Sequence, residues 1–521
     1  MRSTKRSVGL LVASLLACGS LVACGGGSSA GDSEAKDSLN VWLYQKPDGT
    51  LSPISPASGP DGMVMSLMYE SLLASNPQQE LVPELAAAMP EISADAKTFT
   101  FKIRPDAKWS DGEPLTSKDV LFSYEMAATP ESGSVMVATL EGLTFSAPDD
   151  ETFVVESKTS NFGLLLQIGL MGIMPEHELS DLPVKEFATN EYFTAPKLAS
   201  GPYKFVENKV DQYVKVTANP EYHKQPAIKD IFLKPVTADV AVAQLGTGEI
   251  DLASVVATDV ESVKSLEGIE VTTGETGGFV RASWNIDQER FKDPRVRQAF
   301  LYGLDREAIV ESALAGQGTV RNSTFGPNVA GDDLEQYPYD PEKAKALLKE
   351  AGWDSSKPVE LSWIAGTNPD RDAAATAMEA QLNEVGIKIE LNQVQASFFE
   401  DAYENQAFDM VLYGGGTYTT ESWNVFPINS CETWIPNGAN IGHYCNKELD
   451  KLMKEANATV DEAARLDLYK QAAAMENKDP SMMWIYNPDG VWAANSKLKN
   501  FEGLDPSGLG FWKAEDWTFE E

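Results

Sequence analysis

The first 23 residues of the chain have the layout of a secretory signal, and this decides where the rest of the chain folds. Arg2, Lys5 and Arg6 give a basic start, and an uncharged apolar stretch then runs from Val8 to Ala23. The stretch is shorter than the roughly 20 apolar residues of a membrane-spanning helix, and glycine and serine interrupt it. We therefore expect residues 1–23 to be cleaved as a signal peptide and the remaining chain to fold outside the cytoplasm.

The cleavage point resembles that of bacterial lipoproteins. Leu21-Val22-Ala23-Cys24 is similar to the lipobox, where the peptidase of that family cuts before a cysteine whose sulfur carries a diacylglycerol. The resemblance implies a lipid anchor at Cys24, since two fatty chains suffice for stable attachment. Leu15-Leu16-Ala17-Cys18 is a second match, but a Gly/Ser-rich flexible tether over residues 24–38 begins directly at Cys24. The alternative is an ordinary signal in which both cysteines are small apolar residues.

The length and charge of the remaining chain exclude some classes of protein. The chain has 521 residues, and single hydrophobic cores stop growing near about 250–300 residues, so we expect at least two lobes. The net charge is −36 and becomes more negative when the basic leader is removed. Because nucleic acid is bound through Lys and Arg, this charge argues against a nucleic-acid partner. High solubility is its simplest consequence.

Apart from Cys18 in the leader and Cys24 at the expected anchor, the chain has two cysteines, Cys431 and Cys445. An even pair in an oxidising compartment favours a disulfide. A zinc site using His443 and Cys445 is the alternative, but the segment lacks the paired ligand spacing of zinc sites. We therefore expect neither a metal nor a cofactor.

Strand and helix patterns alternate along the chain without internal repeats, which favours the α/β class with mixed sheets. Residues 98–103 alternate apolar and polar side chains as a half-buried strand does, and Phe408–Tyr413 is a buried apolar run. Helices are expected at 63–73, 341–351 and 373–385, and glycines that supply C-caps follow the last two.

Several segments resemble the ABC-importer solute-binding proteins of bacterial extracellular family 5, which includes oligopeptide- and dipeptide-binding members. The most recognisable is Lys108-Trp109-Ser110-Asp111-Gly112-Glu113-Pro114-Leu115-Thr116, followed by Asp119-Val120-Leu121-Phe122-Ser123. The other blocks, in the family's order, are Leu81–Ala86, Ser200–Phe205, Gly248–Leu252, Asp293–Phe300 and Tyr339–Trp353. Together the resemblance extends from about Leu39 to the C-terminus.

The resemblance implies an α/β, two-lobed periplasmic-binding-protein-like fold with a hinge and an additional domain packed on lobe I. Lobe I is expected to be discontinuous, at 39–75, 195–282 and 485–521. The additional domain is expected at 76–194 and lobe II at 283–484. The ligand is then enclosed between the lobes when the hinge closes.

The segment after Phe408–Tyr413 is the main candidate for ligand contacts. In peptide-binding relatives this strand leads into a Gly-Trp segment, and in many an Asp follows and pairs with the ligand's α-amine. Here Gly414-Gly415-Gly416-Thr417-Tyr418 follows, with neither that Trp nor that Asp. Glycine still lets backbone groups approach a ligand closely, and aromatic rings offer flat faces with a polar edge.

We therefore expect ligand contacts at Gly415, Gly416, Thr417, Tyr418 and Trp423. Trp284 and Asn285, near the predicted hinge crossing, are the next candidates. The alternatives are a surface turn for the first group and ordinary core packing for the second.

We interpret the chain as a solute-binding lipoprotein of an ABC importer, anchored on the extracytoplasmic face of the cell membrane. It is expected to be a monomer that delivers a small solute, most simply a peptide, to the permease subunits; an oligosaccharide is the alternative ligand. A secreted hydrolase is disfavoured because only His177, His223 and His443 are present, without the spacing of a triad, and no zinc-protease or P-loop motif occurs. A sensor lipoprotein without a transport role is the third possibility.

Overall fold

The computed structural model describes residues 36–55, 58–326, 329–331, 333–364, 369–395, 398, 405–416, 425–435, 438–503 and 510–520. Cys18, Cys24 and most of the predicted tether lie outside these residues, as do Thr417, Tyr418 and Trp423. No helix within the described residues is both long enough and apolar enough to cross a membrane.

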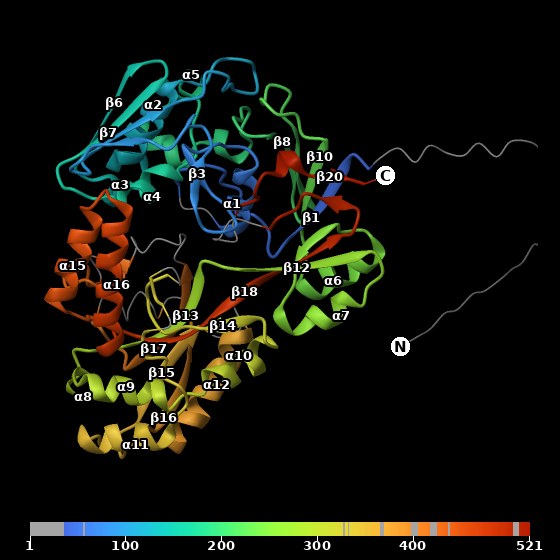
Figure 1. Cartoon of the computed structure of the whole chain (residues 1–521). Coiled ribbons are helices and arrows are strands. Elements are labelled where there is room, and N and C mark those ends of the chain that lie inside the picture. The colour runs from blue at the N-terminus through green and yellow to red at the C-terminus, as the bar shows by residue number, and fades with distance from the viewer. Residues whose placement is uncertain are drawn as a thin grey trace, which may run out of the picture. The chain divides into compact units, whose positions relative to one another are not determined.

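One mixed sheet contains most of the strands, and its two halves share strand β18 (Met483–Asn495), as Figure 1 shows. In the described part of the chain it has 12 strands in the order β16-β15-β17-β13-β18-β11-β1-β10-β9-β8, with β12 and β14 also paired to β18. Residues 489–495 of β18 pair with β12, whereas Met483, Trp484 and Tyr486 pair with β13. We call β1 and β8–β12 the β1 half, and β13–β17 the β17 half.

The β1 half is assembled from segments that lie far apart in the sequence. β1 runs parallel to β10 and β11, and β10, β9 and β8 form an antiparallel ladder. Leu39, Val41 and Leu233 are fully buried in its core. Its elements are β1 (Ser38–Leu43), α1 (Gly59–Ser66), β8 (Tyr203–Lys209), β9 (Tyr213–Ala218), β10 (Asp230–Pro235), α6 (Ala238–Thr247), β11 (Leu252–Ser254), α7 (Val260–Lys264) and β12 (Ile269–Glu275), with the pair β19 (Leu498–Lys499) and β20 (Thr518–Phe519) near the C-terminus.

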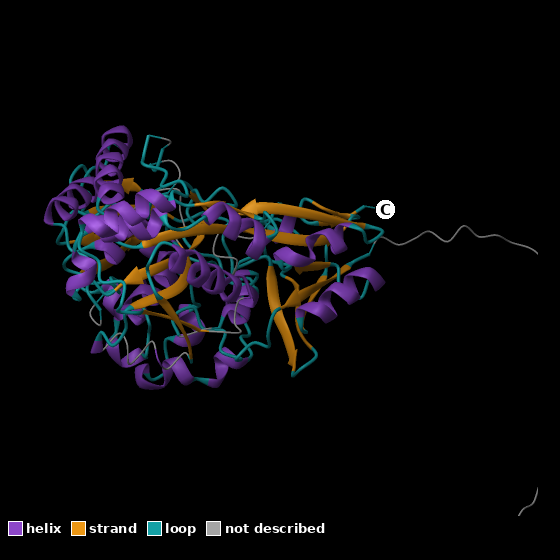
Figure 2. Cartoon of the chain, turned by 90° about the horizontal axis from the view of Figure 1, so that it is seen from below, coloured by secondary structure: helices purple, strands orange, loops and turns teal. Residues whose placement is uncertain are grey.

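The β17 half combines the parallel pair β15–β16 with the antiparallel pair β13–β17. Helices flank the long strands of the sheet, as Figure 2 shows. The elements are β13 (Gly278–Trp284), α8 (Glu289–Lys292), α9 (Pro294–Tyr302), α10 (Arg306–Leu314), β14 (Gly318–Val320), α11 (Pro341–Glu350), β15 (Val359–Ile364), α12 (Pro369–Glu384), β16 (Ile389–Val394), β17 (Met410–Gly416), α14 (Val425–Asn429), α15 (Lys447–Asn457) and α16 (Glu462–Lys478).

Two chain segments cross between the halves, and they contact each other. β12 ends at Glu275 and β13 begins at Gly278; between them, the Thr276 hydroxyl donates a hydrogen bond to the Pro488 carbonyl of β18 at 2.8 Å. Gly318 packs at the same place, because an added Cβ would lie 2.5 Å from the Asn487 carbonyl oxygen. In the described part of the chain the two connecting segments therefore lie side by side, as a hinge requires.

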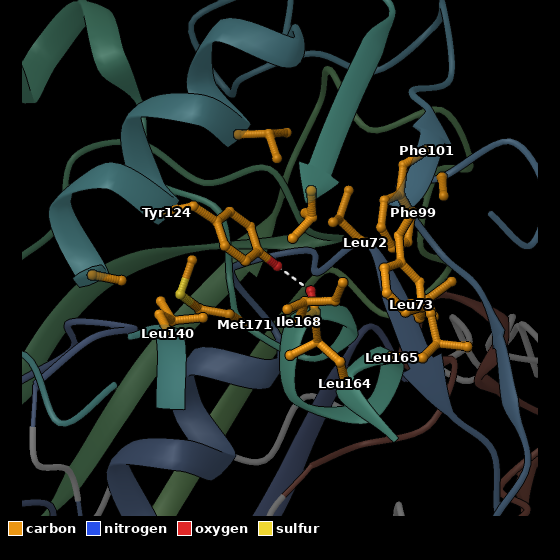
Figure 3. Packing of buried hydrophobic residues seen from close by; sticks show 14 of the residues in the cluster. Leu72, Leu73, Phe99, Phe101, Tyr124, Leu140, Leu164, Leu165, Ile168 and Met171 are labelled. Atoms are coloured by element: carbon orange, nitrogen blue, oxygen red, sulfur yellow. Dashed lines mark hydrogen bonds between the residues drawn. The ribbon is translucent and has the colours of Figure 1, made fainter. Parts of the chain in front are cut away.

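A separate antiparallel sheet, in the order β4-β5-β7-β6, follows α1 in the sequence. Figure 3 shows the core beside it, where the Tyr124 hydroxyl donates a hydrogen bond to the Ile168 carbonyl among Phe99, Phe101 and Leu164. The elements of this region are β2 (Leu73–Ser75), β3 (Leu81–Pro83), β4 (Glu91–Ile92), β5 (Thr98–Lys102), α2 (Ser117–Ala128), α3 (Val137–Leu140), β6 (Leu143–Asp149), β7 (Thr152–Ser157), α4 (Leu164–Gly169) and α5 (Glu176–Leu179).

Helices α15 and α16 follow β17 in the sequence but pack against the core of this separate sheet. Leu449 and Tyr469 belong to the same hydrophobic cluster as Phe162. The Phe162 N–H donates to the Asn457 carbonyl at 2.5 Å, and the Arg465 guanidinium lies 3.8 Å from the centre of the Phe162 ring. Helices α15 and α16, which follow β17 in the sequence, are therefore in contact with the core of the β4–β7 sheet, although they share no strand with it.

The helix expected at 63–73 lies closer to the N-terminus than predicted. α1 begins at Gly59 because Ser58 and Asp61 form a capping box and Pro60 occupies the first turn. It ends at Ser66, and Leu73 already belongs to β2. The prediction was wrong because it followed apolar spacing alone and missed the capping residues.

The described residues begin inside the predicted tether of residues 24–38. β1 starts at Ser38, and Lys36 Nζ lies 2.6 Å from both carboxylate oxygens of Asp251. The Asn40 N–H donates to the same carboxylate at 2.9 Å. The last residues of the predicted tether are therefore part of the sheet and its contacts.

Candidate ligand-binding site

The glycines at the end of β17 lie next to the crossing between the two halves of the sheet. Gly414, Gly415 and Gly416 pair with Val280, Phe279 and Gly278 of β13. Gly278 follows directly after the segment that crosses from β12. The predicted contacts Gly415 and Gly416 are therefore at the hinge end of the β17 half.

The second side of this strand end is not covered by a described strand. β15 pairs with β17 at Met410 and Val411, and the pairing does not continue toward Gly416 within the described residues. Backbone groups at such an edge can form hydrogen bonds with an added extended chain. The end of β17 therefore offers a place where a peptide could bind as an extra strand.

Two arginine side chains pack directly against these glycines. A Cβ added to Gly414 would lie 3.1 Å from Arg371 Nη2, and one added to Gly415 would lie 3.3 Å from Arg281 Nη2. Because successive residues of a strand point to opposite faces, the two guanidinium groups lie on opposite sides of the strand. The missing side chains at 414 and 415 thus make room for arginines as well as for close approach of a ligand backbone.

Arg281 is stacked between aromatic rings. Its guanidinium carbon lies 4.3 Å from the ring centre of Phe279 and 4.4 Å from that of Tyr413. Arg321 lies 4.4 Å from the Phe279 ring centre, so rings and guanidinium groups alternate. Such contacts contribute about 0.5–2 kcal/mol each, more when water is excluded.

The two stacked arginines differ in how fully they are hydrogen-bonded. Arg321 donates to the carbonyls of Ser323, Thr324 and Phe325 and to the Asn487 side chain. Arg281 donates weakly to the Gly415 carbonyl at 3.4 Å, and its buried Nε has no hydrogen-bond partner among the described residues.

Burial, with Arg281 adding to its effect, lowers the pKa of Arg321 to about 10, so Arg321 keeps its charge at neutral pH. Arg281 is the guanidinium with unused donor capacity beside the glycines. An anionic group of a ligand would supply the acceptor that it lacks.

Trp284 and Asn285, the second pair of predicted contacts, lie in the interior. Trp284 is fully buried at the end of β13 and meets Phe300 edge to face at 5.8 Å between ring centres. The Asn285 amide donates to the carbonyls of Gln406 and Phe408 at 3.0 Å each. The contacts that the structure shows for both residues are internal, and a ligand contact at either one remains a prediction.

The predicted disulfide between Cys431 and Cys445 is present, so Cys445 is not available as a zinc ligand. His443 instead approaches the Asp287 carboxylate at 2.8 Å through Nδ1 and stacks on Trp434 at 4.7 Å between ring centres. No cluster of metal-binding side chains exists among the described residues. The bridged loop thus supports the segment after Trp284 by packing and hydrogen bonding.

A cavity of about 650 Å³ lies away from all of these residues. Its described lining comes from α1, the region of Glu70–Glu84, Arg104, residues 167–172, Tyr222, His223 and residues 510–515. None of the predicted ligand contacts is among its described lining residues.

The arginines beside the glycines and the acids of the cavity were both missed by sequence reasoning. Arg281 did leave a signal, because it interrupts the apolar run Phe279-Val280-Arg281-Ala282 in a strand. Burying a charged side chain in such a run costs free energy unless the charge is paired or hydrogen-bonded, so its presence indicates a specific contact. The cavity residues come from distant segments and follow no motif.

Comparison with known proteins gives a consistent family assignment. The family model of bacterial extracellular solute-binding proteins, family 5, matches residues 80–436. A Brucella melitensis protein named as an ABC transporter peptide-binding protein is 31% identical over 98% of this chain and 99% of its own length. The oligopeptide-binding protein AppA of Bacillus subtilis is 28% identical, with 84% of each chain covered.

Solved structures show the same fold. The structure of Bacillus subtilis AppA in complex with a nonapeptide has a TM-score of 0.77 at 25% identity and covers 94% of this chain and 100% of its own. The ABC transporter substrate binding protein CtaP of Listeria monocytogenes has a TM-score of 0.84 at 22% identity, with 94% and 100% covered. The predicted two-lobed α/β fold is thereby confirmed, while the predicted domain boundaries stay a prediction.

Proposed function

We propose, from the premise that the chain belongs to the bacterial extracellular solute-binding proteins of family 5, that it captures a peptide and delivers it to the permease of an ABC importer. Family membership makes the chain a transport protein that binds a solute, and not an enzyme. The choice of a peptide rests mainly on one observation, the strand edge at the end of β17 that no described strand covers. A peptide backbone supplies the matching row of donors and acceptors.

The proposed site extends from Gly415 and Gly416 through Thr417 and Tyr418 to Trp423. Arg281 would receive a carboxylate of the bound peptide, since its buried Nε has no hydrogen-bond partner among the described residues. Trp284 and Asn285 are proposed as further ligand contacts, and their internal contacts hold β13 and the neighbouring loop in place. In this proposal the strand end, the crossing at Thr276 and the ligand lie together, so that hinge closure and binding are coupled.

The chain is proposed to act as a monomer on the extracytoplasmic face of the membrane, held by a lipid on Cys24. Lobe I is proposed at 39–75, 195–282 and 485–521, the additional domain at 76–194 and lobe II at 283–484. The sheet pairing supports this division, because β18 changes partners from β13 to β12 between Tyr486 and Asp489. An oligosaccharide is the alternative ligand, favoured by the aromatic and hydroxyl residues after Gly416.

Ligand class can be tested by thermal unfolding of residues 24–521 with peptides of two to nine residues and, in parallel, with oligosaccharides. A ligand that binds the folded state alone stabilises it by about 2.7 kcal/mol at 100 times its dissociation constant. We expect peptides with a free carboxyl terminus to raise the melting temperature and amidated peptides to do so less. A response to oligosaccharides with none to peptides would replace the ligand assignment.

The anchor can be tested by membrane fractionation of the full chain. Cys24→Ala is expected to release the protein from the membrane, because the sulfur that carries the lipid is removed. Cys18→Ala is the matched control and should remain attached. Release by Cys18→Ala with retention of Cys24→Ala would move the anchor to residue 18.

A further inference from the structure

The 650 Å³ cavity is distinct from the end of β17 and has the size of a small-molecule site. Small-molecule pockets are typically about 300–1,000 Å³ and mostly apolar, with a few converging polar groups. Much of this wall is apolar, and the residues that form it come from α1, α4, the loops beside them and the C-terminal segment. They are Met65, Met136, Leu170, Met171 and Phe511.

The polar part of the wall carries more negative than positive groups. Glu70 is almost fully buried and accepts from Arg104 Nη2 at 3.1 Å. Glu84 accepts from the N–H and the hydroxyl of Ser71 at 2.8 Å each, which are neutral donors. Glu515 has no hydrogen bond or ion pair within the described residues, and the exposed ammonium of Lys513 lies over the Trp512 ring at 5.1 Å.

Arg104 is the partly buried counter-charge of this cluster, and more than one group shares it. Besides Glu70 it contacts the imidazole of His223 at 3.1 Å, and its Nε lies 3.7 Å from Asp106. One guanidinium therefore serves several carboxylates. Glu84 and Glu515 are partly buried and form no ion pair within the described residues. Removing a carboxylate from water without a positive partner is costly, and a bound cation would reduce that cost.

The carboxylates are not arranged to hold a metal ion. No described group of three or more acidic, His or Cys side chains converges on one point. Carboxylates spread along the wall of a cavity with methionine and aromatic side chains fit an elongated molecule better. The complementary ligand therefore has a positive nitrogen at one end and an apolar body.

We infer that this cavity is a second binding site, separate from the peptide site, which takes a small organic amine with an aliphatic or aromatic body. The ammonium group lies at Glu84 and Glu515, and the apolar body lies against the methionines. Because the described lining comes from the β1 half, the β2–β7 region and the C-terminal segment, occupancy does not require closure of the β17 half.

The acids also make this binding dependent on pH. Burial raises the pKa of Glu70 to about 8, although the Arg104 guanidinium opposes the shift. Burial likewise raises the pKa of Glu84 to about 7, and hydrogen bonds from Ser71 oppose it. The charged and titratable groups around the cavity are Glu70, Glu84, Glu515, Asp106, Arg104, Lys224, Lys513, His223 and Tyr222.

A positive nitrogen favours the ionised carboxylates, so amine binding should release protons and weaken as the pH falls through 7. The same release would be absent for a neutral ligand of equal size.

The test is titration calorimetry of residues 24–521 with hexylamine as the probe, and with hexanol and hexanoate as neutral and anionic controls. We expect hexylamine to bind at least about tenfold more tightly at pH 8.5 than at pH 6.0, with proton release detected by changing the buffer. Hexanol should bind more weakly at pH 8.5 and show no pH dependence, and hexanoate should not bind. Equal binding of all three probes, or no binding of hexylamine, would overturn the proposal.

Variants locate the site and separate it from the peptide site. Glu84→Gln and Glu515→Gln should each weaken hexylamine binding about tenfold or more, whereas Glu390→Gln, on distant β16, should not. Glu515 is only partly buried and forms no hydrogen bond or ion pair within the described residues, so its variant remains informative if Glu84→Gln folds poorly. Hexylamine should still bind when the protein is saturated with a peptide; displacement by peptide would assign the amine to the peptide site instead.

Discussion

The end of β17 and the cavity beside Glu84 both bury charged groups, but they handle charge in opposite ways. At β17, Arg281 lies against the rings of Phe279 and Tyr413. Arg321 lies against the ring of Phe279 and keeps a pKa of about 10 despite burial. In the cavity, burial moves the pKa of Glu70 to about 8 and that of Glu84 to about 7. The first region is positive throughout the physiological range, whereas the second changes charge within it.

The difference follows from the two side chains. A guanidinium is planar, weakly hydrated and starts from a very high pKa, so it tolerates an aromatic environment without losing its proton. A carboxylate starts near about 4.3, and burial pushes it toward the neutral form by several units. A chain with a net charge of −36 thus uses arginine for permanent charge and glutamate for adjustable charge.

The largest expected effect is the loss of peptide affinity when the permanent charge of Arg281 is removed. Arg281→Met should weaken the binding of a peptide with a free carboxyl terminus about 100-fold, or ~3 kcal/mol, because a buried charged hydrogen bond is lost. Arg281→Lys should recover part of the affinity, since the charge remains but the planar stack does not. Titration calorimetry measures both, with the exposed Arg295→Met as control.

Unchanged peptide affinity in Arg281→Met would show that Arg281 does not bind the carboxylate of the peptide. The arginine stack would then be a packing device of the β17 half.

The next effect is a change in how the free energy of unfolding depends on pH, and it comes from the titratable side chain of Glu84. In the folded protein Glu84 holds a proton up to about pH 7, whereas the unfolded chain loses it near about pH 4.3. The folded state therefore binds more protons between these values, and stability falls as the pH rises through that window. Between pH 5 and pH 8, the free energy of unfolding of Glu84→Gln should fall by about 1–2 kcal/mol less than that of the natural protein.

Urea unfolding at four pH values checks this slope. Arg281→Met should leave the slope as it is, because this substitution removes no carboxyl group. A Glu84→Gln variant with the natural slope would show that the carboxyl is ionised in the folded protein.

The smallest effect tests how tightly the arginine and the strand fit. A methyl group at residue 415 would lie 3.3 Å from Arg281 Nη2, the far end of a flexible side chain. Gly415→Ala should therefore displace the guanidinium and weaken peptide binding about fivefold, with a loss of folding stability of about 1 kcal/mol. Gly274→Ala, on β12, is the control for the general cost of replacing a strand glycine, since nothing lies near its Cβ position and its φ, like that of Gly415, is not positive.

Much of the fold follows from local sequence patterns. The alternation at Thr98–Lys102 gives β5, and glycines end α11 and α12 where the sequence places them. The pair Cys431–Cys445 was deducible from cysteine number and compartment alone. Each of these features depends on a few neighbouring residues, so spacing is enough to find it.

The candidate site could be predicted only in part. The glycines of β17 are visible in the sequence, but the arginine beside them is 134 residues away in the chain. Glu70, Arg104 and Glu515 meet through tertiary packing that no local pattern encodes. Even α1 was misplaced where the capping pair Ser58 and Asp61 outweighed apolar spacing.

The contact between Lys36 and Asp251 has a mechanical consequence for a chain tethered at its N-terminus. A pulling force at residue 36 acts first on the ion pair between Lys36 and Asp251, whose atoms are 2.6 Å apart. It then acts on β1. Because β1 runs parallel to β10 in register from Ser38 to Leu43, a pull along the strand loads the rungs of that ladder together in shear. The attachment point is therefore reinforced where a membrane anchor would apply its force.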